Sequence, residues 1–177
     1  MEYTYYQKYI NFLKKYNIFN KEILEYIRKN SMHFNYMEEE KREFIGCFYI
    51  QDKNNTLQKI HICIPYIDSD LTVLINIHEY IHILSSYPYI NRKFKLSKEV
   101  ETLPIFYEQL YYLDNQSEYL KKEMIKLSNQ ILNSDQIEYK IALYCKEELL
   151  DYYSKEKPHF KKLQRKAKQM SNKYINK

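Results

Sequence analysis

The sequence predicts a mainly α-helical fold with one small β-hairpin (α+β), organised as a single domain over residues 1–177. Hydrophobic residues make up 45% of the chain, and in most segments they recur at the three- and four-residue spacing of a helix. One glycine and four prolines are too few for the turns of a many-stranded fold. The single glycine also excludes the Gly-rich loops that bind nucleotide phosphates.

Apolar periodicity and β-rich composition divide the chain into its expected elements. Helices are predicted over residues 5–16, 21–29, 71–85, 98–113, 116–132, 135–153 and 159–175. Asn35 followed by Glu38 is typical of a helix start and predicts a further short acidic helix. Residues 43–50 and 56–67 are rich in Phe, Tyr and Ile, and the polar turn between them completes the predicted hairpin.

The sequence carries no recognisable export or membrane signal. Residues Met1–Tyr6 lack the basic region and apolar run of a secretory signal. The longest apolar stretch, Leu71–Leu84, contains two histidines and a glutamate, so it is not a predicted membrane span. Three widely spaced cysteines indicate reduced thiols rather than a disulfide framework. We therefore expect a cytoplasmic protein without a transmembrane segment.

Positive charge is concentrated at the C-terminal end of the chain. Residues 155–177 contain nine basic residues and one acid, Glu156. Phe160, Leu163, Ala167 and Met170 form an apolar stripe among these lysines, which predicts a basic amphipathic helix. Such a helix packs on its own domain with a solvated lysine face, which we favour, or it contacts nucleic acid or an anionic surface.

The chemistry of the chain is concentrated in the pattern H-E-x-x-H within the helix predicted at 71–85. His78 and His82 are four residues apart, so their imidazoles lie on one helix face and can converge on one zinc ion (Zn²⁺). Glu79 lies close enough to deprotonate a zinc-bound water and then protonate the leaving amine. The alternative is a pair of core histidines hydrogen-bonded to backbone or tyrosine.

A catalytic zinc usually has a third protein ligand and one open position. The next predicted helix offers three carboxylates: Glu99, Glu101 and Glu108. Glu101 and Glu108 are seven residues apart and share a helix face, so one can bind the ion while the other supports a ligand. Glu99 is expected to face solvent.

The segment His78–His82 followed by Val100–Glu108 resembles the catalytic core of the thimet oligopeptidase and oligopeptidase F family, a gluzincin family in which glutamate is the third ligand. The resemblance implies zinc ligands at His78, His82 and Glu101, a general base at Glu79 and a supporting carboxylate at Glu108. It covers about 40 of the 177 residues. Pro104 follows Glu101 by three positions instead of two, and the loop between the two segments is shorter than in that family.

Other residues are weaker candidates for the same site. The resemblance also implies a downstream oxyanion-stabilising residue, for which Tyr139 and Tyr144 are the candidates. His61 precedes the metal helix and is a candidate for the cleft. The strand Lys59–Tyr66 could pair with an extended substrate or serve as a plain hairpin strand.

Together these patterns predict a small zincin-like domain, a zinc-dependent metallopeptidase that acts on a peptide or protein substrate. ImmA/IrrE-like regulatory proteases are an alternative of similar size, although Val100–Thr102 does not match their Glu-Ala-Asn or Glu-Ala-Asp run. A further alternative is a non-catalytic zinc-containing module that binds its partner through the basic C-terminal helix. The intact Glu79 favours catalysis, because a purely structural zinc does not require that carboxylate.

Overall fold

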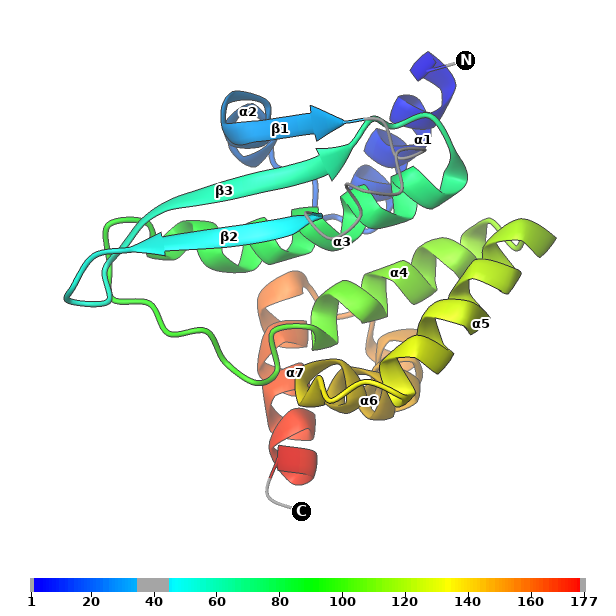
Figure 1. Ribbon diagram of the computed structural model, residues 1–177. Helices are drawn as coiled ribbons and strands as arrows, with labels where there is room; N and C mark the ends of the chain where they lie inside the picture. The colour runs from blue at the N-terminus through cyan, green and yellow to red at the C-terminus, as the bar shows by residue number, and fades with distance from the viewer. Residues whose placement is uncertain (1, 35–44, 176–177) are drawn as a thin grey trace. The chain divides into compact units, whose positions relative to one another are not determined.

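A computed structural model describes residues 2–34 and 45–175 of the chain (Figure 1). Contacts divide the chain into two compact units, residues 1–96 and residues 97–177, and each is described by itself. The predicted fold class, mainly helical with a small β element, is confirmed. Among the described residues, no helix combines the length and the apolar character that a bilayer span requires.

The first unit begins with two helices, α1 (Glu2–Lys15) and α2 (Lys21–Asn30), close to the predicted ranges. Asn20 caps α2, because its side-chain oxygen accepts hydrogen bonds from the backbone N–H groups of Glu22 and Ile23 at 2.9 and 3.2 Å. Both helices contribute apolar side chains to the core of this unit: Tyr9, Phe12, Leu13, Ile23 and Ile27.

The predicted hairpin is confirmed as strands β2 (Gly46–Gln51) and β3 (Leu57–Pro65), which pair antiparallel. Asp52 closes the turn: its Oδ1 accepts hydrogen bonds from the backbone N–H groups of Asn54 and Thr56 at 2.8 and 2.9 Å. Asn55 adopts the left-handed conformation (φ 59°) that asparagine tolerates better than most residues.

The hairpin is part of a larger sheet, which the sequence did not predict. Strand β1 (Ser31–Phe34) pairs in parallel with β3, so the order is β1-β3-β2 and β3 is the central strand (Figure 1). A four-residue strand has too little alternation to recognise, and its partner comes much later in the chain. The short helix predicted from Asn35 lies outside the described residues.

Helix α3 (Asp70–Ser86) packs along the sheet and carries the H-E-x-x-H residues. Ser69 and Thr72 form a reciprocal cap: the Thr72 backbone N–H donates to Ser69 Oγ at 3.2 Å, and the Ser69 backbone N–H donates to Thr72 Oγ1 at 2.9 Å. Apolar residues surround the helix almost completely, and most of it is buried, as predicted. A 3-10 helix, η2 (Tyr87–Tyr89), follows it.

The second unit contains the helices α4 (Thr102–Asp114), α5 (Glu118–Leu132), α6 (Ile137–Glu156) and α7 (Phe160–Ile175). Helix α6 packs against the other three, and the core includes Phe106, Leu110, Cys145, Leu149 and Leu163.

Helix α4 begins four residues later than predicted, because residues 98–101 form turns instead. The Thr102 backbone N–H donates to the Glu99 carbonyl oxygen at 3.0 Å, a three-residue turn that leads into the helix. Pro104 is the third residue of α4. It lies in the first turn as expected, where a backbone N–H has no partner within the helix.

Candidate metal centre

Three neighbouring polar side chains of helix α3 are buried within about one helical turn. His78, Glu79 and His82 are 8%, 6% and 7% exposed. The four-residue spacing places both imidazoles on one face of the helix. Asn76 ties this part of α3 to the end of β3, because its Nδ2 donates to the Pro65 carbonyl oxygen at 3.2 Å. The two histidines therefore project from a helix that is fixed to the sheet.

The two imidazoles converge through the same ring nitrogen. The Nε2 atoms of His78 and His82 lie 3.0 Å apart, and the ring centroids are 4.8 Å apart. Two nitrogens bound to one tetrahedral zinc at the usual distances would lie about 3.3 Å apart. The two nitrogens therefore need to move apart only slightly to bind one ion. Without an ion, one Nε2 can donate a hydrogen bond to the other.

Glu79 is a buried carboxylate beside this pair. Its Oε2 atom is buried and has no hydrogen-bond partner among the described residues. A buried carboxylate oxygen without a partner is costly, so its retention here calls for a functional explanation. Burial and then the Glu79 carboxylate raise the pKa of the Cys63 thiol, which therefore stays protonated at neutral pH.

The three candidate carboxylates differ in their surroundings. Glu101 is the residue immediately before α4 and is 8% exposed, and Glu108 lies within α4 and is 4% exposed. The prediction that Glu99 faces solvent is wrong. Its side chain is only 16% exposed and forms an ion pair with Lys168 at 3.9 Å. The turn that precedes α4, rather than a helix, sets the direction of Glu99.

Within the part of the chain that the structure describes, one group of three residues could hold a metal ion: His78, His82 and Glu101. Each offers one ligand atom, and these atoms all lie within 4.8 Å of one another. Two imidazole nitrogens and one carboxylate oxygen form a donor set suited to a divalent transition-metal ion. Neither Glu99 nor Glu108 belongs to the group.

The weaker candidates have other contacts. Tyr139 packs against the cluster of Ile105, Ile131 and Ala142 in the second unit. Tyr144 is 54% exposed and stacks on the Tyr174 ring, with centroids 5.5 Å apart. These contacts are packing contacts, and the oxyanion role of either tyrosine stays a prediction.

Strand β3 lies between β1 and β2, and Ile62 and Cys63 pair with both neighbours, so these two residues have no free edge for a substrate. The pairing with β2 agrees with the alternative, a plain hairpin strand. His61 is exposed and stands opposite Phe48 in the sheet. Within the described sheet, β2 is the edge strand beside α3, and Cys47 Sγ donates to the Glu79 carbonyl oxygen at 3.6 Å.

The predicted basic amphipathic helix is confirmed as α7, and several of its charges are neutralised within the second unit. Lys162 pairs with Glu156 at 3.7 Å, and Lys173 pairs with Glu148 at 3.4 Å. Lys166 Nζ lies 5.3 Å from the centre of the Tyr152 ring. These contacts favour a helix that packs on its own unit over a dedicated nucleic-acid surface.

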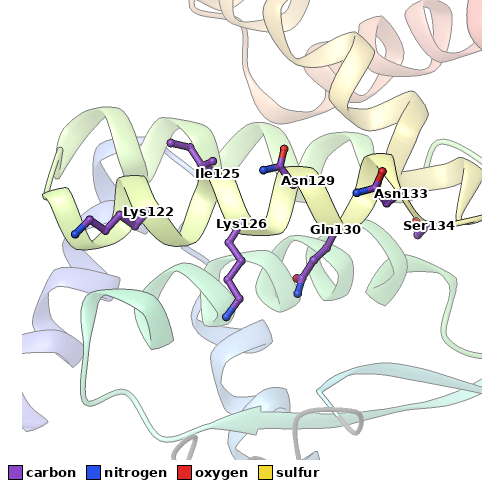
Figure 2. A pocket seen from close by; sticks show the side chains of 7 residues that line it. All are labelled: Lys122, Ile125, Lys126, Asn129, Gln130, Asn133 and Ser134. Carbon is purple, nitrogen blue, oxygen red and sulfur yellow. The ribbon is translucent and has the colours of Figure 1, made fainter.

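A shallow open groove runs along one face of α5 (Figure 2). Its lining consists of Lys122, Ile125, Lys126, Asn129, Gln130, Asn133 and Ser134. The sequence did not single out any of these residues, and none of the predicted metal ligands lines the groove.

No family model, curated protein or solved structure matches this chain.

Proposed function

We propose that this protein is a zinc-dependent metallopeptidase whose metal ligands are His78, His82 and Glu101. The observation that carries the proposal is the 3.0 Å separation of the two histidine Nε2 atoms, with a Glu101 ligand atom in the same compact group. Three protein ligands leave a tetrahedral ion one open position, the arrangement that zinc hydrolases use. The resemblance to the oligopeptidase F core rests on these same residues.

Zinc is favoured over other ions by the position of Glu79. Two histidines and one carboxylate also occur at non-haem iron sites. However, a glutamate next to the first of two histidines on one helix is typical of zinc peptidases, in which it serves as the base. The burial of Glu79 beside His78, without a hydrogen-bond partner for Oε2 among the described residues, supports this role.

In the proposed reaction, the protein residues orient the reactants and move the proton. Zinc, when bound, supplies the Lewis acidity that makes water a nucleophile near neutral pH. Glu79 accepts a proton from the attacking water and then donates it to the nitrogen of the departing amine. Glu108 is also buried and lies within α4, the helix that begins directly after Glu101. Its proposed role is to hold the three metal ligands in position.

The first experiment measures the metal directly. Elemental analysis of purified wild-type protein is expected to find one zinc per chain, and Glu101→Ala is expected to bind zinc at least about tenfold more weakly. Glu118→Gln is the matched control, because the Glu118 side chain is 82% exposed. Retention of iron in place of zinc, or unchanged zinc affinity in Glu101→Ala, would contradict the proposal.

The second experiment separates catalysis from metal binding. Glu79→Gln keeps the size of the side chain but removes the base, so zinc content should stay at the wild-type level. Hydrolysis of a fluorogenic peptide library should fall by about 100-fold or more, the usual contribution of a general base. Equal cleavage by the two proteins would show that Glu79 is not the base. Stoichiometric zinc without cleavage by the wild type would favour the non-catalytic module.

A further inference from the structure

Helix α7 contacts the turn that carries Glu101 at two points. Ser171 Oγ lies 3.1 Å from Thr102 Oγ1, which is a hydrogen bond between hydroxyl groups. Lys168 Nζ lies 3.9 Å from the Glu99 carboxylate. Lys168 and Ser171 are three residues apart and therefore share one face of α7. Their partners flank Glu101 on both sides in the sequence.

The two contacts differ in strength. Thr102, Ser171 and Cys145 are fully buried, and Cys145 Sγ extends the contact to α6 at 3.8 Å from Ser171 Oγ. A buried hydroxyl that loses its partner gains no water in exchange, so this bond is costly to break. Lys168, by contrast, is 67% exposed, and an exposed ion pair contributes little. The hydroxyl contact is therefore the main attachment.

The attachment at Thr102 lies directly beside the proposed metal ligand Glu101. Glu101 precedes the first helical residue, and its side chain makes no capping hydrogen bond to the helix. The turn itself is closed by short-range bonds, including the one from the Val100 backbone N–H to the Ser97 carbonyl oxygen at 3.1 Å. A movement of Thr102 would move the neighbouring Glu101 with it, because the two residues share a peptide bond.

We infer that the buried hydrogen bond between Ser171 and Thr102 positions the Glu101 carboxylate for metal binding, so that α7 is a support for the metal centre. This inference rests on the proposed function, which assigns Glu101 as a ligand. It also gives the C-terminal helix a role that its lysines alone did not indicate. Ser171 and Thr102 are positioning residues, since they act through the backbone that carries Glu101.

The test compares zinc affinity, measured by competition with a chromogenic chelator at neutral pH. Thr102→Val and Ser171→Ala remove the bond and should weaken zinc binding about tenfold, the lower end of the range for residues that support metal ligands. Thr102→Ser retains the hydroxyl and should stay within about twofold of wild type. Lys173→Ala is the matched control on α7, because Lys173 pairs with Glu148 instead of the turn.

A double-mutant comparison distinguishes positioning from general destabilisation. If Ser171 acts through Glu101, Ser171→Ala should change the residual zinc affinity less than twofold when Glu101 is already alanine, whereas it costs about tenfold in the wild-type background. The same comparison with the isosteric Thr102→Val covers the case in which Ser171→Ala does not fold. The melting temperature of each metal-free variant is measured as well, to detect general destabilisation.

The outcomes separate the two levels of the proposal. Equal losses in both backgrounds, or wild-type affinity in Thr102→Val and Ser171→Ala, would overturn the positioning role while leaving the metallopeptidase proposal intact. Failure of the wild-type protein to bind zinc would instead overturn the proposed function itself.

Discussion

The Tyr80 hydroxyl donates a hydrogen bond to the Ile18 carbonyl oxygen at 2.7 Å. The same hydroxyl accepts one from the Asn20 backbone N–H at 2.9 Å, and the Tyr80 side chain is fully buried. Tyr80 directly follows Glu79, so the helix that carries the proposed ligands is attached to the connection between α1 and α2.

Replacing Tyr80 by phenylalanine should destabilise the protein without changing its chemistry. The substitution removes two buried hydrogen bonds and leaves the Asn20 N–H and the Ile18 carbonyl without this partner, so we expect a loss of about 1–3 kcal/mol in unfolding free energy. Urea denaturation measures the loss. Tyr66→Phe is the control, because Tyr66 is 54% exposed. A Tyr80→Phe variant as stable as the control would show that the two bonds contribute little.

Zinc should raise the melting temperature through the ligands on α3. At 100 times the dissociation constant, a ligand stabilises the folded state by about 2.7 kcal/mol, which corresponds to a shift of roughly 5–10 °C for a protein of this size. We expect the shift in the wild type and in Glu79→Gln, and little or none in His82→Ala. Differential scanning calorimetry with and without zinc makes the comparison. A full shift in His82→Ala would place the ion elsewhere.

Glu108→Gln tests whether the buried carboxylate within α4 supports the metal centre. Glu108 is 4% exposed, and the substitution removes its charge while keeping its size. We expect zinc affinity to fall about tenfold and the metal-free protein to fold normally. The chelator competition described for Ser171 provides the measurement. An affinity equal to that of Glu118→Gln would restrict Glu108 to a role in packing.

Gly46, the only glycine, begins β2 with a φ of +151°. A side chain rarely adopts this backbone conformation, although among the described residues nothing beyond the two chain neighbours lies within 4 Å of the place where a Cβ would stand. Gly46→Ala should therefore cost about 1–3 kcal/mol through backbone strain rather than through a clash. Asn55→Gly, at a left-handed position in the hairpin turn, should be nearly neutral in the same denaturation experiment.

The basic helix α7 should bind nucleic acid only weakly. Since Lys162, Lys168 and Lys173 already pair with acidic residues, we expect a dissociation constant no tighter than about 1 μM for a DNA duplex at physiological salt, the range of non-specific binding. Fluorescence anisotropy over a salt series measures it. Nanomolar affinity with a steep salt dependence would instead favour the binding-module alternative.

Local spacing made α3 and its two converging histidines predictable from the sequence. His78 and His82 are four positions apart, and any α-helix places such a pair on one face, whatever packs around it. The apolar run from Leu71 predicted a buried helix to within one residue at each end, because its cap and periodicity are local properties. The oxyanion candidates had no comparable spacing, and the contacts of Tyr139 and Tyr144 are structural.

The sequence by itself determined the pair of imidazoles, the adjacent Glu79 and the mainly helical class, since these follow from interactions within one helix turn. The resemblance to the oligopeptidase F core had already indicated Glu101 as the third ligand. Only the tertiary structure made β3 a central strand and bonded Ser171 to Thr102. These features join residues that are distant in the chain. Their packing depends on the whole arrangement of side chains, which no local period encodes.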